Sequence, residues 1–246
     1  MKNIKIHSFT WYFLFISFLC GYIKYSLIIF FIVIIHEIGH LVFIKLYHFS
    51  IISVTIYPFG GMTKIEKKIN TPNKKDFMIA LGGPIFQLFL FLICLFPFNI
   101  TFKATFIKYN LSILCFNLLP IIPLDGSQLL NTWLNMFFSY KTSYYIYCLI
   151  SIISIIIYLL GNYWFSLNNY LIITLFILKS YEAIKNYKYV YNKFLLERYL
   201  DEFSFKRIST KKGTLDLLKK ETYQYFKEDN KIISEKKLLA RRFDKQ

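Results

Sequence analysis

A metal-ligand motif lies inside an apolar run long enough to cross a membrane, and this combination constrains the fold most strongly. Between residues 25 and 46 the only formally charged side chains are Glu37 and Lys45. A membrane-spanning helix needs about 20 predominantly apolar residues, so the run is predicted to be one. His36 and His40 are four residues apart, so on a helix both imidazoles project from one face and can bind the same metal ion. Glu37 follows His36 about 100° round the helix, where it can act on a metal-bound water without being a ligand.

The composition indicates a membrane protein with several spans. Apolar residues make up 56% of the 246 residues and aromatic residues 20%, which is more than soluble domains contain. An ionisable residue in a membrane-length apolar run indicates function by default. The alternative is a soluble core helix in which the two histidines only complete hydrogen bonds. Four cysteines lie in apolar runs without CxxC spacing, so they are predicted to be buried apolar side chains: Cys20, Cys94, Cys115 and Cys148.

Charge is distributed unevenly along the chain. Residues 1–178 hold 12 lysines, no arginine and four acidic residues, whereas residues 179–246 hold 18 basic and 10 acidic residues. The chain is therefore divided into a transmembrane domain, residues 1–181, and a basic cytoplasmic C-terminal tail, residues 182–246, which is at most a small ordered unit. Because the tail mixes acidic with basic residues and has no nucleic-acid-binding motif, no nucleic acid partner is expected.

Six transmembrane helices are predicted. The fold class is an all-α polytopic membrane protein with a small membrane-edge β-hairpin and a short cytoplasmic tail. The spans cover about residues 7–23, 25–48, 77–98, 106–124, 143–160 and 167–181. Lysines concentrate in the segments on one side of these spans, and the positive-inside rule assigns that side, with both termini, to the cytoplasm.

The interval between the second and third spans is predicted to be a hairpin at the membrane edge, residues 51–66. Residues 51–57 are β-branched and aromatic, residues 58–61 (PFGG) form a turn signal, and residues 62–66 alternate. An edge strand here could add an extended substrate to its sheet. The alternative is a plain connecting loop.

Asp125 is the predicted third metal ligand. A catalytic zinc site has three protein ligands and one open position for water, and His36 and His40 supply two. Apart from Glu37, Asp125 is the only acid of the transmembrane domain that falls in an apolar stretch, at the end of the fourth predicted span, where a lone carboxylate costs about 3 kcal/mol or more. Counted along their helices, His36 and Asp125 both fall in the inner half of the bilayer. The alternative role of Asp125 is to cap the helix that follows it.

Two motifs in combination resemble the site-2 protease family of intramembrane zinc metalloproteases. They are HEIGH at residues 36–40 and NLLPIIPLDG at residues 117–126. Other segments resemble the stage IV sporulation factor-B type of that family, which processes pro-sigma-K: PFGG at 58–61, GP at 83–84, YNLSIL at 109–114 and FLLERY at 194–199. The resemblance covers about residues 4–200.

The resemblance implies a role for each matching residue. The ligands of the cofactor, Zn²⁺, would be His36, His40 and Asp125. The general base would be Glu37. The substrate-binding residues would be Asn117, Gly60 and Gly61.

The resemblance also implies a location and partners. The protein would be a multi-pass protein of a bacterial cell membrane, the mother-cell membrane if it acts in sporulation. Its partners would be a membrane-tethered protein substrate such as a pro-sigma factor, and inhibitory or regulatory membrane proteins. The sporulation type ends in a nucleotide-sensing CBS domain, and the 46 residues after Leu200 are too short and too charged for one to be expected.

The predicted function is regulated intramembrane proteolysis, in which a peptide bond is hydrolysed near the cytoplasmic face. The main alternative is an ion- or proton-coupled transporter whose buried His, Glu and Asp side chains line an ion path. An inactive homologue that only binds partners is the third hypothesis, and the intact ligands and base argue against it.

Overall fold

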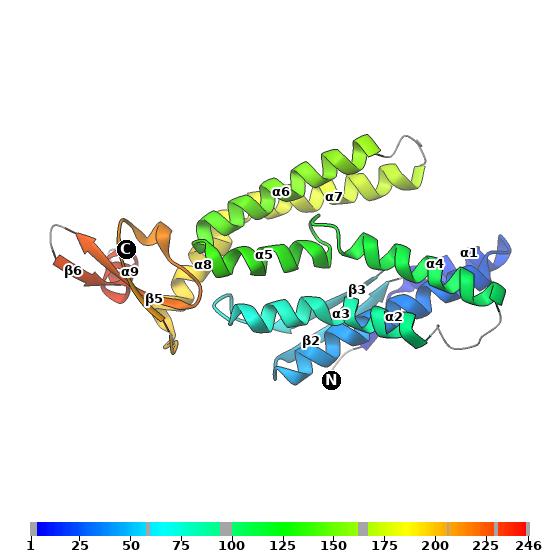
Figure 1. Ribbon diagram of the computed structural model, residues 1–246, viewed down its shortest axis with the longest axis horizontal. Helices are drawn as coiled ribbons and strands as arrows, with labels where there is room; N and C mark the ends of the chain where they lie inside the picture. Colours follow the sequence, from blue (N-terminus) through cyan, green and yellow to red (C-terminus); the bar gives the residue numbers. More distant parts are fainter. Residues whose placement is uncertain are drawn as a thin grey trace. The chain divides into compact units, whose positions relative to one another are not determined.

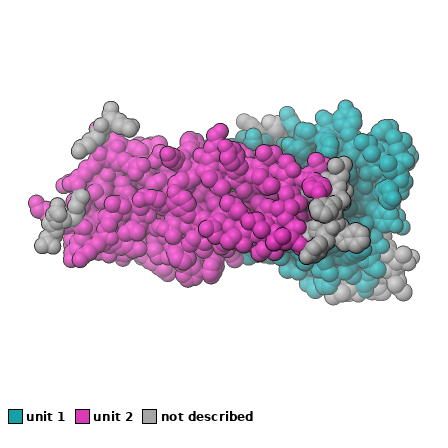
Figure 2. Space-filling model, turned by 90° about the horizontal axis from the view of Figure 1, so that it is seen from above, with its two compact units in different colours: residues 1–67, 78–118 teal, residues 68–77, 119–246 magenta. Residues whose placement is uncertain are grey.

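The computed structural model describes residues 4–57, 60–93, 100–161, 167–205, 207–228 and 231–244 (Figure 1). Contacts divide the chain into two compact units (Figure 2). Unit 1 comprises residues 1–67 and 78–118, and unit 2 comprises residues 68–77 and 119–246. The predicted division at residue 181 separates a membrane domain from a tail by composition, whereas the two units are defined by contacts. The predicted division therefore stays a prediction.

Unit 1 contains a three-stranded sheet in the order β1-β2-β3. β1 (Ile4–Ile6) pairs in parallel with β2 (Ser50–Tyr57), and β2 pairs antiparallel with β3 (Gly60–Glu66). β2 and β3 fall in the interval where strands were predicted, while their position at a membrane edge stays a prediction. Two residues of the predicted turn, Pro58 and Phe59, lie outside the described residues. The sequence did not indicate β1, because three residues are too few to show a period of two.

The helices of unit 1 pack closely where glycines meet. They are α1 (Ser8–Leu19), α2 (Ile23–Leu46), α3 (Asn73–Ile93), whose first turn belongs to unit 2, and α4 (Ile100–Asn117). A Cβ on Gly39 of α2 would lie 2.3 Å from the carbonyl oxygen of Gly82 of α3. Small residues at such a crossing let two helix backbones approach each other. The crossing brings α3 against the part of α2 that carries the histidines.

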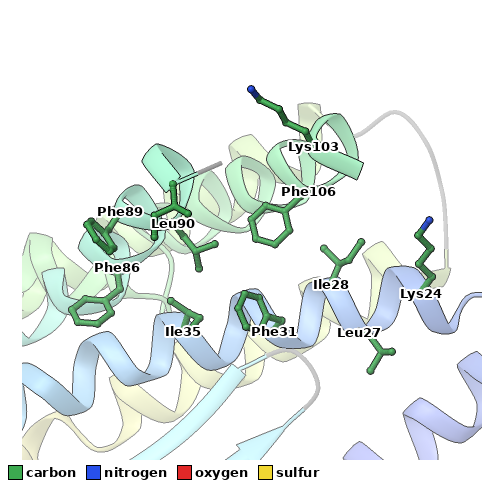
Figure 3. Close-up of a pocket in the computed structure, with 11 residues that line it drawn as sticks. Lys24, Leu27, Ile28, Phe31, Ile35, Phe86, Phe89, Leu90, Lys103 and Phe106 are labelled. Carbon is green, nitrogen blue, oxygen red and sulfur yellow. The ribbon is translucent and has the colours of Figure 1, made fainter. Parts of the chain in front are cut away.

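An apolar cavity of about 660 Å³ lies between α2, α3 and α4 (Figure 3). Lys24 and Lys103, in the first turns of α2 and α4, are the charged residues of its lining. Ile35 and Phe86 also line it, and they directly precede His36 and Gln87 in the chain.

Three helices are long and apolar enough to cross a membrane, among the residues that the structure describes. They are α2, α3 and α6 (Tyr140–Gly161), which correspond to the second, third and fifth predicted spans. α1 is apolar but only 12 residues long, and α4 and α7 (Leu167–Lys185) are not among the three. A multi-pass membrane protein is therefore supported, whereas the total of six spans stays a prediction.

Within the predicted fourth span, residues 106–124, the helix is interrupted at the two prolines, and the span itself stays a prediction. α4 ends at Asn117, and α5 (Asp125–Phe137) begins at Asp125. Pro120 and Pro123 explain the break, because a proline disfavours helical backbone in the residue before it and lacks an N–H itself. In the irregular segment the Ile122 N–H donates to Ser151 Oγ of α6 at 3.0 Å, as buried non-helical backbone requires.

The C-terminal part of unit 2 contains more structure than was predicted. After α8 (Tyr187–Leu200) comes a second sheet in the order β4-β5-β6, formed by β4 (Arg207–Lys212), β5 (Thr222–Glu228) and β6 (Lys231–Ser234). The 3₁₀ turn η1 (Leu215–Leu217) and α9 (Glu235–Phe243) complete it. Its core is formed by α6, α8, β5 and α9 and consists of Tyr140, Tyr191, Phe194, Leu195, Leu218, Phe226 and Leu239. An all-α class with one hairpin was therefore incomplete.

Candidate metal centre

His36 and His40 lie together on α2, as their spacing predicts. His36 is 4% exposed, and His40 is half-buried. Their Nε2 atoms are 3.0 Å apart, and the two rings meet at 79°. The two nitrogens are thus close enough to bind one ion.

The other nitrogen of each ring is engaged by α3. His40 Nδ1 lies 2.8 Å from the carbonyl oxygen of Ile79, and His36 Nδ1 lies 2.8 Å from Gln87 Oε1. A carbonyl oxygen only accepts, so His40 Nδ1 carries the proton and Nε2 presents its lone pair. Metal-binding histidines typically donate their second N–H to a carbonyl or carboxylate in this way.

Gly83 of α3 keeps the space beside both Nε2 atoms open. A Cβ on this residue would lie 2.5 Å from Nε2 of His36 and 2.5 Å from Nε2 of His40. Any larger residue would therefore occupy the position that a shared ion needs. In the sequence, Gly83 stood out only as part of the GP pair at residues 83–84.

Glu37 is held by the sheet of unit 1. Its Oε1 accepts the backbone N–H of Gly61 at 2.8 Å. A Cβ on Gly61 would lie 2.5 Å from both Cδ and Oε2 of Glu37, so a larger residue here would displace the Glu37 carboxylate. Gly60, in contrast, faces open space. The substrate-binding role of these two glycines stays a prediction.

Asp125 is the acidic member of the candidate ligand group. Among the described residues, His36, His40 and Asp125 are the group that could hold a metal ion. Two imidazole nitrogens and a carboxylate oxygen are a donor set of catalytic zinc sites. These donors and the open space at Gly83 fit zinc.

The alternative role of Asp125 as a helix cap does not agree with the start of α5. Leu124 occupies the N-cap position, and no side-chain capping bond is present there. Asp125 is the first helical residue and not the cap. Its role as a metal ligand stays a proposal.

The other predicted site residue, Asn117, is the half-buried last residue of α4, and its substrate-binding role stays a prediction. The sequence did not indicate the partners of the histidines, Ile79 and Gln87. The one available signal was that Gln87 is an uncharged polar residue within the third predicted span.

The chain is similar to several known proteins. A family model described as Peptidase family M50 matches residues 24–105. The chain is 29% identical to stage IV sporulation protein FB of Bacillus subtilis, covering 80% of this chain and 71% of that protein. It is 32% identical to a putative zinc metalloprotease of Synechocystis, covering 44% of this chain and 30% of that protein. It is 28% identical to a zinc metalloprotease of Methanocaldococcus jannaschii, covering 48% of this chain and 36% of that protein.

The fold also has a counterpart among solved structures. The structure of a site-2 protease from Methanocaldococcus jannaschii matches with a TM-score of 0.50 and 23% identity. The match covers 83% of this chain and 95% of that one.

Apolar helices, a histidine pair with a neighbouring glutamate, and these relatives define a membrane-embedded zinc metalloprotease. Residues 24–105 match the model of peptidase family M50, and the fold resembles that of a solved site-2 protease. Between the hypotheses of a protease and a transporter, the comparisons therefore support the protease.

Proposed function

We propose that the protein cleaves a membrane-tethered protein near the cytoplasmic face of a bacterial cell membrane. The observation that carries the proposal is the group His36, His40 and Asp125, with Glu37 on the same helix as the two histidines. Relatives named as zinc metalloproteases support it.

In the proposed mechanism His36, His40 and Asp125 hold the zinc ion. When bound, zinc lowers the pKa of a water molecule to about 7 and polarises the scissile carbonyl. Glu37 accepts the proton of the attacking water and returns it to the leaving amine nitrogen. The hydrogen bond from the Gly61 N–H to Glu37 holds the carboxylate in one position for both transfers.

The substrate has to be unwound before it can react. A transmembrane helix bonds its amides internally, so its peptide bonds are not presented to a metal site. We propose that β3 holds the unwound segment by strand addition, because in the described sheet β3 pairs only with β2 and has a free edge. Gly60 and Asn117 are proposed to contact this segment.

The proposed substrate is a membrane-tethered pro-sigma factor, cleaved in the mother-cell membrane of a sporulating bacterium. The likeness to stage IV sporulation protein FB over 80% of this chain supports a role in sporulation. Inhibitory or regulatory membrane proteins are proposed as further partners. Co-expression with candidate pro-sigma and anti-sigma factors, followed by immunoblotting for the shortened product, tests the substrate class.

The first prediction concerns Glu37. Glu37→Gln is expected to lower the cleavage rate by about 10²–10⁴-fold, because the amide cannot accept the proton. Zinc content should stay at the wild-type level, since Glu37 is not a ligand. Lys45→Gln, which removes the other charge of the same apolar run, is the matched control and should cleave normally. Cleavage by Glu37→Gln at the wild-type rate would refute the assignment of the base.

A further inference from the structure

Gln87 and Asn110 form a buried polar network behind His36. Gln87 lies on α3 and Asn110 on α4, and both are 0% exposed. Burying an amide side chain costs free energy unless its donors and acceptors are bonded. The partners of these two residues therefore determine what the network does.

Asn110 fixes the orientation of the Gln87 amide. Asn110 Nδ2 donates to the backbone carbonyl oxygen of Gln87 at 3.0 Å. Asn110 Oδ1 consequently faces Gln87 Nε2, at 3.4 Å. Because Nε2 is directed to Asn110, Oε1 is the Gln87 atom that meets His36 Nδ1, at 2.8 Å.

An acceptor in this position selects the tautomer of His36. Only a ring protonated on Nδ1 can donate to Oε1, and that ring presents a lone pair at Nε2. A reversed amide would turn its NH₂ group to Nδ1 and require the proton on Nε2, the atom 3.0 Å from Nε2 of His40. His40 has no such freedom, because its partner is the backbone carbonyl of Ile79.

We propose that Gln87 and Asn110 are positioning residues that hold His36 in the tautomer and ring orientation that bind zinc. The proposal rests on the proposed function, because it takes His36 as a ligand. The competing role is a polar link that only joins α3 to α4. Both roles predict some loss of stability on substitution, so the test has to measure zinc binding separately.

Two substitutions of Gln87 separate these roles. Gln87→Met removes the acceptor while keeping a side chain of similar size, and Gln87→Glu keeps the acceptor but loses the donor to Asn110. If the network positions His36, Gln87→Met weakens zinc binding by about 10–100-fold, whereas Gln87→Glu stays close to wild type. A helix link alone predicts no loss of zinc affinity in Gln87→Met. It also predicts that Gln87→Glu is the less stable variant, because Gln87→Glu buries a carboxylate that Asn110 cannot satisfy through Oδ1.

Asn110 offers a second pair of variants. Asn110→Asp keeps the acceptor for Gln87 Nε2 but loses the donor to the Gln87 carbonyl oxygen. Its zinc affinity should therefore fall less than that of Asn110→Leu, which releases the amide altogether. Leu90→Ala is the control for general destabilisation, because Leu90 is a buried core residue of α3. This variant should lower the melting temperature with the zinc dissociation constant unchanged.

The measurements use the full-length protein in detergent. Zinc dissociation constants are obtained by competition with a chromophoric chelator, and the histidine tautomers of the metal-free protein by ¹⁵N NMR, with assignment through His36→Gln. The expected wild-type signal is an Nδ1–H ring for His36, which shifts towards Nε2–H in Gln87→Met. Two results would overturn this proposal alone, provided that the wild type binds zinc. Either Gln87→Met binds zinc as tightly as the wild type, or Gln87→Glu binds it as weakly as Gln87→Met. A wild type that does not bind stoichiometric zinc overturns the proposed function as well.

Discussion

Gly83 illustrates how a single residue without a side chain can decide whether the metal centre forms. Gly83→Ala is expected to weaken zinc binding by about 10-fold or more, because its Cβ would lie 2.5 Å from both histidine Nε2 atoms. Zinc content after gel filtration measures the effect. Gly161→Ala is the control, since nothing lies within 4 Å of the added Cβ there. Full zinc occupancy in Gly83→Ala would mean that the ion binds elsewhere.

Asp125→Asn tests the third ligand. The amide keeps the size of the side chain but removes the anionic ligand, so zinc affinity should fall by at least about 10-fold. The metal-free protein should lose no more than about 1 kcal/mol of stability, the usual worth of one acid in a first helical turn, because removing a carboxylate from an apolar region is itself favourable. Chelator competition and thermal unfolding with excess chelator provide the two readouts. Unchanged zinc affinity would remove Asp125 from the ligand set.

The residues differ in how far the sequence could predict them. The spacing of His36 and His40 sufficed, because a helix fixes the relative direction of side chains four positions apart. Asp125 could be inferred because a carboxylate in an apolar region needs a partner. Gln87 and Gly83 were not recognised as site residues, since their roles depend on the crossing of α2 and α3, which no local pattern encodes.

At the scale of elements, α8 and α9 are joined by a buried ion pair. Arg198 Nη2 lies 3.0 Å from Glu235 Oε1, and the two side chains are 0% and 2% exposed. Arg198→Met should destabilise the fold by about 3–5 kcal/mol, because it leaves a buried carboxylate without its cation. Lys236→Met, which removes an exposed partner of Glu202, is the control and should have little effect.

The pH dependence of this variant has a definite sign. Burial raises the pKa of Glu235, and Arg198 opposes that rise, so the pKa should rise further in Arg198→Met. A carboxyl group with a raised pKa in the folded state does not lower the free energy of unfolding below its unfolded-state pKa of about 4.3. The loss of stability grows as the pH rises through the folded-state pKa. The stability deficit should therefore be smaller at acidic pH than at pH 8. A deficit independent of pH would indicate lost packing instead.

The same elements show why the second sheet was not predicted. β4 has the sequence RISTKK and β6 has KIIS, so neither offers the alternation of apolar and polar residues that indicates a half-buried strand. Among the three strands, β5 contributes the core residue Phe226, which is only 1% exposed. These strands are stabilised by pairing with one another and by packing on α8 and α9, which are tertiary effects.

For the whole molecule, the number of spans determines where the termini lie. An odd number, such as the three helices that qualify among the described residues, places the termini on opposite sides, and six place them on one side. α4 and α7 contain 18 and 19 residues, which at 1.5 Å per residue is close to the apolar thickness of about 30 Å. α1, with 12 residues, requires local thinning of the bilayer or a continuation beyond its helical limits.

We predict that both termini lie in the cytoplasm, because most lysines of the transmembrane domain, and the basic tail, fall on one side of six spans. A fluorescent reporter that matures only in the cytoplasm should be bright at either end of the chain. The same reporter inserted between residues 161 and 167, on the predicted outer side, should be dark, and an alkaline phosphatase fusion there should be active. A dark N-terminal fusion with a bright C-terminal one would establish an odd number of spans. The loss of α1 as a span is then the simplest explanation, because it is the shortest of the predicted membrane helices.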